Sequence, residues 1–168
     1  MKRHCLALFA ALLASACSSP DVPVRNPASD ARAIAKVERL NTVPAMAIAP
    51  QPITFADIER NDLFGAGCYF LDGSGEARTM LFLASDQKGW LKLEGRIVAL
   101  SADRGSDKLP YSTWTKYVGL ANTVRLTRDA VGERQTGPET ASAPGTIVIR
   151  DAKDRTVYKR SGIIECGA

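Results

Sequence analysis

Two cysteines that lie far apart in the sequence, Cys68 and Cys166, enclose a series of short segments in which apolar and polar residues alternate. A period of two is typical of β-strands that bury one face and expose the other. The clearest example spans residues 122–128, where we expect Val124 and Leu126 to face the core and the arginines to face solvent. This repeated alternation restricts the chain to a fold that is mainly β.

Turn-forming residues divide this part of the chain into seven to nine short strands, or about eight. Residues 72–75 and 86–89 predict turns, Gly95 predicts a β-bulge, and residues 132–144 predict a long loop. We expect strands over residues 68–71, 77–84, 90–94, 96–100, 111–118, 122–128, 146–149, 155–159 and 163–166. No helical period interrupts them, which favours a small antiparallel β-barrel, with a β-sandwich as the alternative.

The beginning of the chain has the composition of a secretory signal peptide. Lys2 and Arg3 supply the basic start, an apolar run follows over residues 6–14, and small residues precede Cys17. The apolar run is about half as long as a bilayer-spanning helix, so we expect no permanent anchor helix. We therefore expect the mature chain to be exported.

The segment Leu13-Ala14-Ser15-Ala16-Cys17 resembles the processing box of bacterial lipoproteins, in which the mature chain begins with a lipid-modified cysteine. The resemblance implies that residues 1–16 are removed and that Cys17 carries the lipid. Cleavage by an ordinary signal peptidase is the alternative, because the small residues suit that enzyme too. Ser18 after the cysteine resembles lipoproteins sorted to the outer membrane. The expected location is therefore the cell envelope, facing the periplasm or the cell surface.

Residues 17–52 are expected to form a flexible tether. Six of the nine prolines lie in this segment, which carries too little apolar surface to order itself. Within it, residues 31–40 could form a short helix capped by Ser29 or Asp30. Such a helix would be marginally stable on its own.

A second expected helix, over residues 54–64, leads directly into the strand region. Thr54 and Asp57 have the spacing of an approximate capping box. Gly65 or Gly67 is expected to end the helix, because glycine readily adopts the conformation that follows a last helical turn.

Cys68 and Cys166 are the pair left in the mature chain, because Cys5 lies in the signal and Cys17 is the lipid acceptor. An even pair in an oxidising compartment is expected to form a disulfide. This bond would tie the first strand to the last within a folded domain of residues 53–168. Closing a barrel in this way removes exposed strand edges.

The composition excludes several classes of function. The only histidine, His4, lies in the signal, so the mature chain has no Ser-His-Asp or Cys-His arrangement and no histidine metal site. The motif from Ser85 to Lys88 matches Ser-x-x-Lys hydrolases but falls at a strand end rather than a helix start. The formal charge of +4 is spread along the chain and forms no basic stripe for nucleic acid. We expect no enzyme activity, cofactor, metal or nucleic-acid partner.

The expected strand over residues 111–118 carries the most suggestive side chains. Trp114 and Lys116, next to Tyr111 and Tyr117, could form a recognition patch for a protein partner. The alternative is a tryptophan half buried in the core beside a solvated lysine.

These residues resemble the membrane-bound inhibitors of c-type lysozyme, which are small lipoprotein β-barrels. The matching elements are, in order, Ser101-Ala102, Gly105-Ser106, Tyr111, Trp114-Thr115-Lys116, Thr156-Val157-Tyr158-Lys159-Arg160 and Cys166. The resemblance implies a partner-binding set of Ser101, Ser106, Tyr111, Trp114 and Lys116. It also implies that Ser101 or Ser106 would enter the lysozyme cleft together with Lys116, which the acidic catalytic residues would attract.

A lipid anchor, a proline-rich tether and a disulfide-bearing barrel are also combined in metalloprotease-inhibiting lipoproteins, which the chain resembles in architecture. A structural or assembly lipoprotein of the outer membrane is the other alternative. We therefore expect a non-enzymatic bacterial envelope lipoprotein that contacts the membrane through the lipid on Cys17. Its β domain is expected to bind a protein partner, with inhibition of c-type lysozyme as the specific hypothesis.

Overall fold

The computed structural model describes residues 26–73 and 77–168. The chain divides into two compact units, Met1–Val43 and Pro44–Ala168. In the described part of both units, no helix is long and apolar enough to cross a membrane. The predicted signal peptide and Cys17, the predicted lipid acceptor, lie outside the described residues.

Helix α1, Pro27–Asn41, forms the first unit's regular structure in the described residues. Asn26 caps it, because its side-chain oxygen accepts a hydrogen bond from the backbone N–H of Ala28. Pro27 suits the first helical position, where its missing N–H would have no partner in any case. The helix predicted over residues 31–40 is therefore present but begins earlier, since the cap lies before the proline.

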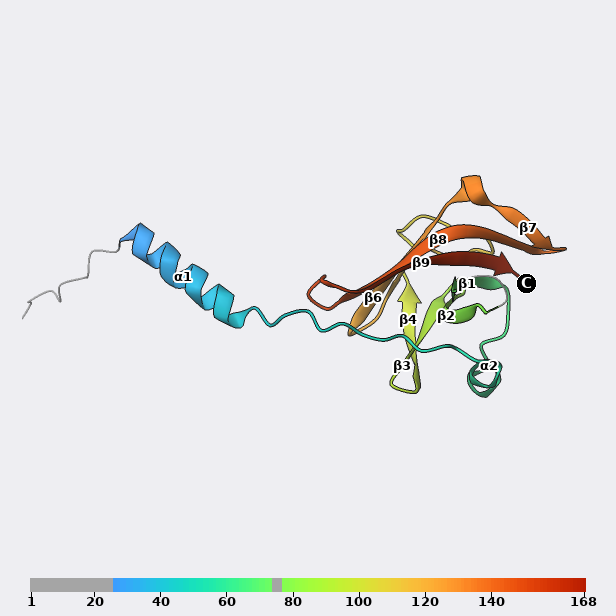
Figure 1. Ribbon diagram of the computed structural model, residues 1–168, viewed down its shortest axis with the longest axis horizontal. Helices are drawn as coiled ribbons and strands as arrows, with labels where there is room; N and C mark the ends of the chain where they lie inside the picture. The colour runs from blue at the N-terminus through green and yellow to red at the C-terminus, as the bar shows by residue number, and fades with distance from the viewer. Residues whose placement is uncertain (1–25, 74–76) are drawn as a thin grey trace, which may run out of the picture. The chain divides into compact units, whose positions relative to one another are not determined.

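The second unit is built on a closed antiparallel barrel of eight strands, which confirms the predicted fold class (Figure 1). The ring consists of β1 (Gly67–Asp72), β2 (Thr79–Ala84), β3 (Lys88–Leu93), β4 (Arg96–Ala102), β5 (Lys116–Val118), β6 (Asn122–Arg128), β8 (Thr140–Asp151) and β9 (Thr156–Gly167). Neighbours in this order pair with one another, and β9 pairs with β1 to close the ring. The short β7 (Arg134–Gly137) follows the 3₁₀ turn η1 (Ala130–Gly132) and pairs with the start of β8.

The seam between the first and last strands carries the predicted disulfide. Cys68 and Cys166 lie directly opposite each other on β1 and β9, with their Cα atoms 4.1 Å apart and their sulfurs bonded. The buried Thr113 contacts this bond, and its hydroxyl donates to the sulfur of Cys68 at 3.2 Å. The disulfide thus joins the two strands whose pairing closes the ring.

The interior of the barrel is filled by side chains from all eight ring strands. Tyr117 packs edge-on against Phe82, with ring centroids 5.4 Å apart. Gly89 makes this pair possible, because a Cβ at that position would lie 2.3 Å from the ring of Phe82. The buried core consists of Cys68, Phe70, Leu81, Phe82, Ala84, Leu91, Leu100, Tyr117, Val124, Leu126, Ile147, Ile149, Val157, Ile164 and Cys166. Val124 and Leu126 face inward, as the alternation predicts.

A second apolar cluster lies on the outer face of β1 to β4. Leu83 points outward from β2, and Ile53 and Leu63, which flank helix α2 (Phe55–Asn61), pack against it. Tyr69, Met80, Trp90 and Ile97 of the four strands and Ile58 of the helix complete the cluster. This side of the barrel is therefore covered by the segment that precedes β1.

A buried ion pair fastens α2 to the barrel. The carboxylate of Asp57 accepts hydrogen bonds from the ammonium of Lys92 at 2.8 and 3.0 Å, and from the N–H and hydroxyl of Thr54 at 2.9 and 2.7 Å. The lysine and the Thr54 N–H hold the pKa of Asp57 well below its usual range. Thr54 and Asp57 form the predicted capping box. The helix ends at Asp62, in the left-handed conformation with φ 52°, and not at Gly65 or Gly67 as predicted.

The extended segment before α2 belongs to the same compact unit as the barrel, which begins at Pro44, whereas its composition predicted a tether up to residue 52. The N–H of Ile48 donates to the carbonyl of Val157 at 3.1 Å, and Gln51 bridges to Lys92 on β3. Ile48 also packs against the inner core. The composition predicted that the folded domain starts at Ile53. A proline-containing segment shows no sequence pattern that would indicate its backbone pairing with a strand.

Three predicted features of the sheet are wrong in detail. Gly95 forms no bulge: with Glu94 it makes a two-residue turn, both at positive φ, between β3 and β4. Residues 132–144 form η1, β7 and the start of β8 instead of a loop. The strands predicted over 155–159 and 163–166 are one continuous β9, which runs beside the equally long β8 (Figure 1).

Candidate functional site

A row of aligned cations crosses the outer face of β5, β6, β8 and β9. Helix α2 packs on β1 to β4, away from this row. Lys116 on β5 lies opposite Arg125 on β6, which lies opposite Val148 on β8, which in turn lies opposite Lys159 on β9. Tyr117, which follows Lys116, lies in the core, as do the sequence neighbours of Arg125 and Val148, so Lys116, Arg125 and Val148 point outward. At the usual strand spacing the row spans roughly 15 Å. We call Lys116, Arg125 and Lys159 the basic row.

Asp103, the residue that follows β4, continues this row next to Lys116 and is the one carboxylate in it. Its N–H donates to the carbonyl of Lys116, and its side chain pairs with the ammonium of Lys116 at 2.9 Å. The lysine, followed by the N–H of Gly105, holds the pKa of Asp103 below its usual value, and Arg125 contributes in the same direction. Both paired side chains are about one third exposed, at 32% and 33%. Lys116 can therefore exchange Asp103 for another carboxylate at little cost in free energy.

Both predicted partner-binding serines lie beside Asp103. Ser101 is exposed on β4, two residues before Asp103 and opposite Val118. The hydroxyl of Ser106 donates to the carbonyl of Asp103 at 2.7 Å and closes a tight turn. The structure thus gathers Ser101, Ser106 and Lys116, which the sequence resemblance assigned to the lysozyme cleft, around one aspartate.

Trp114 and Tyr117 are held by the barrel itself. Trp114 is half-buried against the core, and its indole N–H donates to the carbonyl of Asp86 at 3.0 Å. The ammonium of Lys108 lies 5.5 Å from the centre of its ring. Tyr117 is fully buried, and its hydroxyl donates to the carbonyl of Ser85 at 2.7 Å. Burial raises the pKa of Tyr117 to about 12, so this tyrosine belongs to the core and not to a surface patch.

Tyr111 lies in a turn, because the strand predicted over residues 111–118 forms only at Lys116–Val118. Tyr111 and Ser112 both adopt the left-handed conformation, at φ 56° and 57°. The hydroxyl of Tyr111 donates to the carbonyl of Glu139 on the turn between β7 and β8. It therefore connects two loops and lines a cavity instead of joining the basic row.

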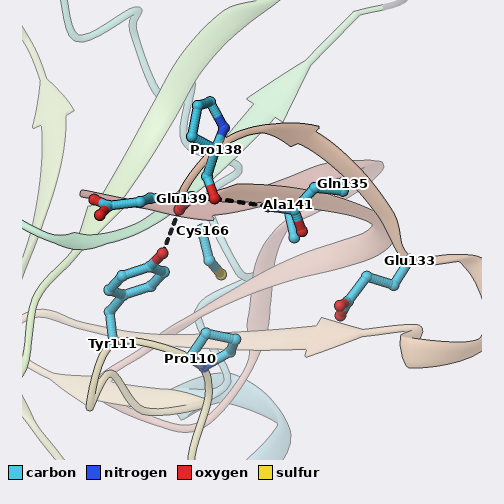
Figure 2. A pocket seen from close by; sticks show the side chains of 8 residues that line it. All are labelled: Pro110, Tyr111, Glu133, Gln135, Pro138, Glu139, Ala141 and Cys166. Atoms are coloured by element: carbon cyan, nitrogen blue, oxygen red, sulfur yellow. Dashed lines mark hydrogen bonds between the residues drawn. The ribbon is translucent and has the colours of Figure 1, made fainter.

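This cavity has a volume of about 350 Å³ and lies between the loop before β5 and the β7–β8 hairpin (Figure 2). Apolar walls come from prolines, an alanine, the Tyr111 ring and the disulfide, and polar ones from two glutamates and a glutamine. The lining residues are Pro110, Tyr111, Glu133, Gln135, Pro138, Glu139, Ala141 and Cys166. The carboxylate of Glu133, one of the lining residues, also accepts a hydrogen bond from Nη1 of Arg128.

Arg128 overturns the prediction that both arginines of β6 face solvent. Arg125 is exposed, but the side chain of Arg128 is only 6% exposed. The reason is the same period of two that places Val124 and Leu126 inside, because Arg128 continues the inward series. The alternation in the sequence was therefore sufficient to predict that Arg128 points inward.

The remaining sequence motifs serve the turns. The Ser85 hydroxyl accepts hydrogen bonds from the backbone N–H groups of Gln87 and Lys88, so the Ser-x-x-Lys motif closes the turn between β2 and β3. Over residues 26–73 and 77–168, no group of three or more His, Cys, Asp or Glu side chains is placed to hold a metal ion.

Comparison with protein-family models, with curated proteins and with solved structures found no match for this chain. The arrangement of its own residues is therefore the basis for proposing a function.

Proposed function

We propose that the β domain binds a protein partner and that the basic row is the centre of the contact surface. The observation that carries the proposal is the alignment of Lys116, Arg125 and Lys159 across β5, β6, β8 and β9, with Asp103 as the one acid in the row. An exposed line of like charge attracts an acidic surface and fixes its orientation. The partner chemistry that suits it is a cleft or patch of carboxylates.

The cleft of c-type lysozyme is the specific partner to test. Lysozyme hydrolyses glycosides with two carboxyl groups in that cleft. In the proposed complex Lys116 leaves Asp103 and pairs with a catalytic carboxylate, while Ser101 or Ser106 on the same face hydrogen-bonds within the cleft. A domain seated there blocks the substrate, so the proposed activity is inhibition without catalysis.

Inhibition kinetics with the full chain test this function. We expect inhibition of c-type lysozyme with a dissociation constant of about 1 µM or lower. Lys116→Ala should weaken it roughly 30-fold, because a central anchor is worth about 2 kcal/mol. Lys153→Ala, in the exposed turn between β8 and β9, is the matched control and should change inhibition by less than about twofold.

Serine substitutions locate the second contact. Ser101→Ala or Ser106→Ala should weaken inhibition, depending on which hydroxyl enters the cleft. No inhibition at about 100 µM of folded, disulfide-bonded chain would reject lysozyme as the partner. A structural or assembly role in the envelope would then be the function to pursue.

We also propose that the chain is a lipoprotein anchored through Cys17, on the strength of the small residues and the short apolar run before it. Cys17→Ser should then move the protein from the membrane fraction to the soluble fraction of the envelope. A wild-type chain without lipid mass, together with a variant that still sediments with membranes, would contradict lipidation.

A further inference from the structure

The side chains that line the cavity beside the disulfide have already used their hydrogen-bond donors. The Nε2 of Gln135 donates to the carbonyls of Gly137 at 2.6 Å and Pro138 at 3.3 Å, which uses both amide hydrogens. Tyr111 donates its one hydroxyl hydrogen to the carbonyl of Glu139. Among the described residues that line the cavity, none carries a positive charge. A ligand that binds the polar side chains of this lining must therefore donate the hydrogen bonds itself.

The groups that remain available in the lining are acceptors. Glu133 binds Arg128 through Oε2, and its Oε1 has no hydrogen-bond partner within residues 26–73 and 77–168. The side chain of Glu133 is 45% exposed, so a ligand has access to this oxygen. The carboxylate of Glu139 and the amide oxygen of Gln135 are likewise unpartnered within the described residues. Two carboxylates against the guanidinium of Arg128 leave an excess of negative charge at the cavity.

The other walls of the cavity are apolar and rigid. Pro110 and Pro138 contribute fixed rings, and Cys166 belongs to the disulfide. Figure 2 shows the ring of Tyr111 and the carboxylate of Glu133 on opposite sides of the cavity, with Cys166 between them. The left-handed backbone at Tyr111 and the hydrogen bond that its hydroxyl donates hold this ring in place, and the residue is 38% exposed. An aromatic face attracts a cation that lies within about 6 Å of its centre.

We propose that this cavity binds a primary ammonium group on a short apolar stem. The ammonium donates to Oε1 of Glu133, with the amide oxygen of Gln135 as a second acceptor, and the stem contacts the prolines and the ring of Tyr111. Glu139 adds negative charge at the edge, which attracts the cation. The volume of about 350 Å³ lies at the lower end of the range for small-molecule sites and suits a short stem.

The apolar walls favour an organic cation over a metal ion, which needs oxygen ligands on several sides. The proposed site uses none of the residues of the basic row. It therefore does not depend on the protein partner, and the two proposals stand or fall separately.

Nuclear magnetic resonance titration of the full chain tests the site, with the backbone N–H signals of Gln135 and Ala141 as reporters. The probe is n-butylammonium. The neutral control is n-butanol, and pentanoate is the anionic control of similar size. We expect n-butylammonium to shift both signals saturably, with a dissociation constant of about 1 mM or lower, and both controls to bind at least about tenfold more weakly.

A charge pair of variants tests the contact with the carboxylate. Glu133→Gln should weaken n-butylammonium binding at least about tenfold, because it removes a charged hydrogen-bond acceptor. Glu59→Gln is the matched control and should change the affinity less than about twofold, because Glu59 is an exposed carboxylate on α2 that does not line the cavity.

An aromatic pair keeps the test decisive if Glu133→Gln does not fold without its contact to Arg128. Tyr111→Leu should weaken n-butylammonium binding about threefold, because it removes the aromatic face. Tyr111→Phe keeps that face and should bind within about twofold of the wild type. Equal affinities in the two Tyr111 variants would contradict a contact between the cation and the ring.

The source of the ammonium is identified by a second probe, Nα-acetyl-lysine N-methylamide, which carries the same group on a peptide unit. Tighter binding of this probe assigns the cavity to a lysine side chain, and tighter binding of n-butylammonium assigns it to a free amine. Three results would overturn the proposal: no shift at about 30 mM n-butylammonium, equal binding of n-butanol, and unchanged affinity in folded Glu133→Gln. Calcium that binds more tightly than the ammonium would also reject an organic cation as the ligand.

Discussion

The two outer faces of the barrel differ in what lies on them. On β1 to β4 the outward side chains include an apolar cluster around Leu83, which α2 and its flanking residues cover. On β5, β6, β8 and β9 the outward side chains include the basic row, of which Arg125 and Lys159 are exposed. A face that packs against another element must be apolar, whereas a face left to solvent can carry charge. The covered face completes the fold, and the exposed face is available for recognition.

Two lysines show the same contrast at the level of single contacts. Lys92 on the covered face is 18% exposed and binds Asp57, whose carboxylate Thr54 also satisfies. Lys116 on the exposed face is 32% exposed and shares Asp103 with solvent. A buried, saturated ion pair resists exchange, and a half-exposed pair allows it. This contrast assigns Lys92 to stability and leaves Lys116 able to make the contact that the proposed function gives it.

The largest expected effect comes from breaking the seam that joins the two faces. Cys68→Ala combined with Cys166→Ala should lower the free energy of unfolding by about 4 kcal/mol, because the disulfide spans 98 residues and restricts the unfolded chain. Urea denaturation of the full chain measures the loss. Two reactive thiols in the unreduced protein, or a loss below about 1 kcal/mol, would contradict the role given to the seam.

The next effect concerns the anchor of the covered face. Lys92→Met should lower the free energy of unfolding by about 3 kcal/mol, because the exposed Arg60, 3.9 Å away, is then the nearest cation recorded for the buried carboxylate of Asp57. Lys88→Met, on the same strand but exposed, is the matched control and should change it by less than about 0.5 kcal/mol. Equal losses of unfolding free energy in the two variants would contradict a stabilising role for the buried pair of Lys92 and Asp57.

Acid should weaken the covered face more than the exposed one. The pKa of Asp57 is lower in the folded chain than in the unfolded chain, so its contribution is complete above about pH 4 and is lost as the pH falls further. Acid unfolding of Asp57→Asn should therefore depend less on pH than that of the wild type. Asp103→Asn should flatten the curve less, because Asp103 is more exposed. Identical wild-type and Asp57→Asn curves would refute this assignment.

The smallest stability effect is expected on the exposed face. Lys116→Ala should change the free energy of unfolding by less than about 0.5 kcal/mol, since it removes a partly exposed ion pair. A loss above about 2 kcal/mol in thermal or urea unfolding would place Lys116 among the structural residues and remove the contrast with Lys92.

Local patterns in the sequence were sufficient to predict the barrel. The period of two placed Val124 and Leu126 inside, and the even cysteine pair indicated the closing bond. The break predicted between strands 155–159 and 163–166 was wrong, because β9 is continuous there. Gly162 is needed for packing against β1, since a Cβ would lie 2.3 Å from the carbonyl of Leu71. Such a packing requirement cannot be seen in a single sequence.

The basic row could be predicted only in part. Lys116 attracted notice beside Trp114, and alternation alone placed Arg125 outside. Their alignment with Lys159 depends on the register between β6, β8 and β9, which brings together residues distant in sequence. Arg128 was misassigned because its residue type was given more weight than its position in the alternating series.

Binding to c-type lysozyme at two salt concentrations tests the central claim, that the exposed face recognises an acidic cleft, most directly. The comparison is between the full chain and a variant that combines Lys116→Gln, Arg125→Gln and Lys159→Gln. We predict that wild-type affinity falls at least about tenfold between roughly 50 mM and 500 mM salt, and that the variant binds weakly at both. A variant that binds as tightly as the wild type, with the same salt dependence, would contradict the claim.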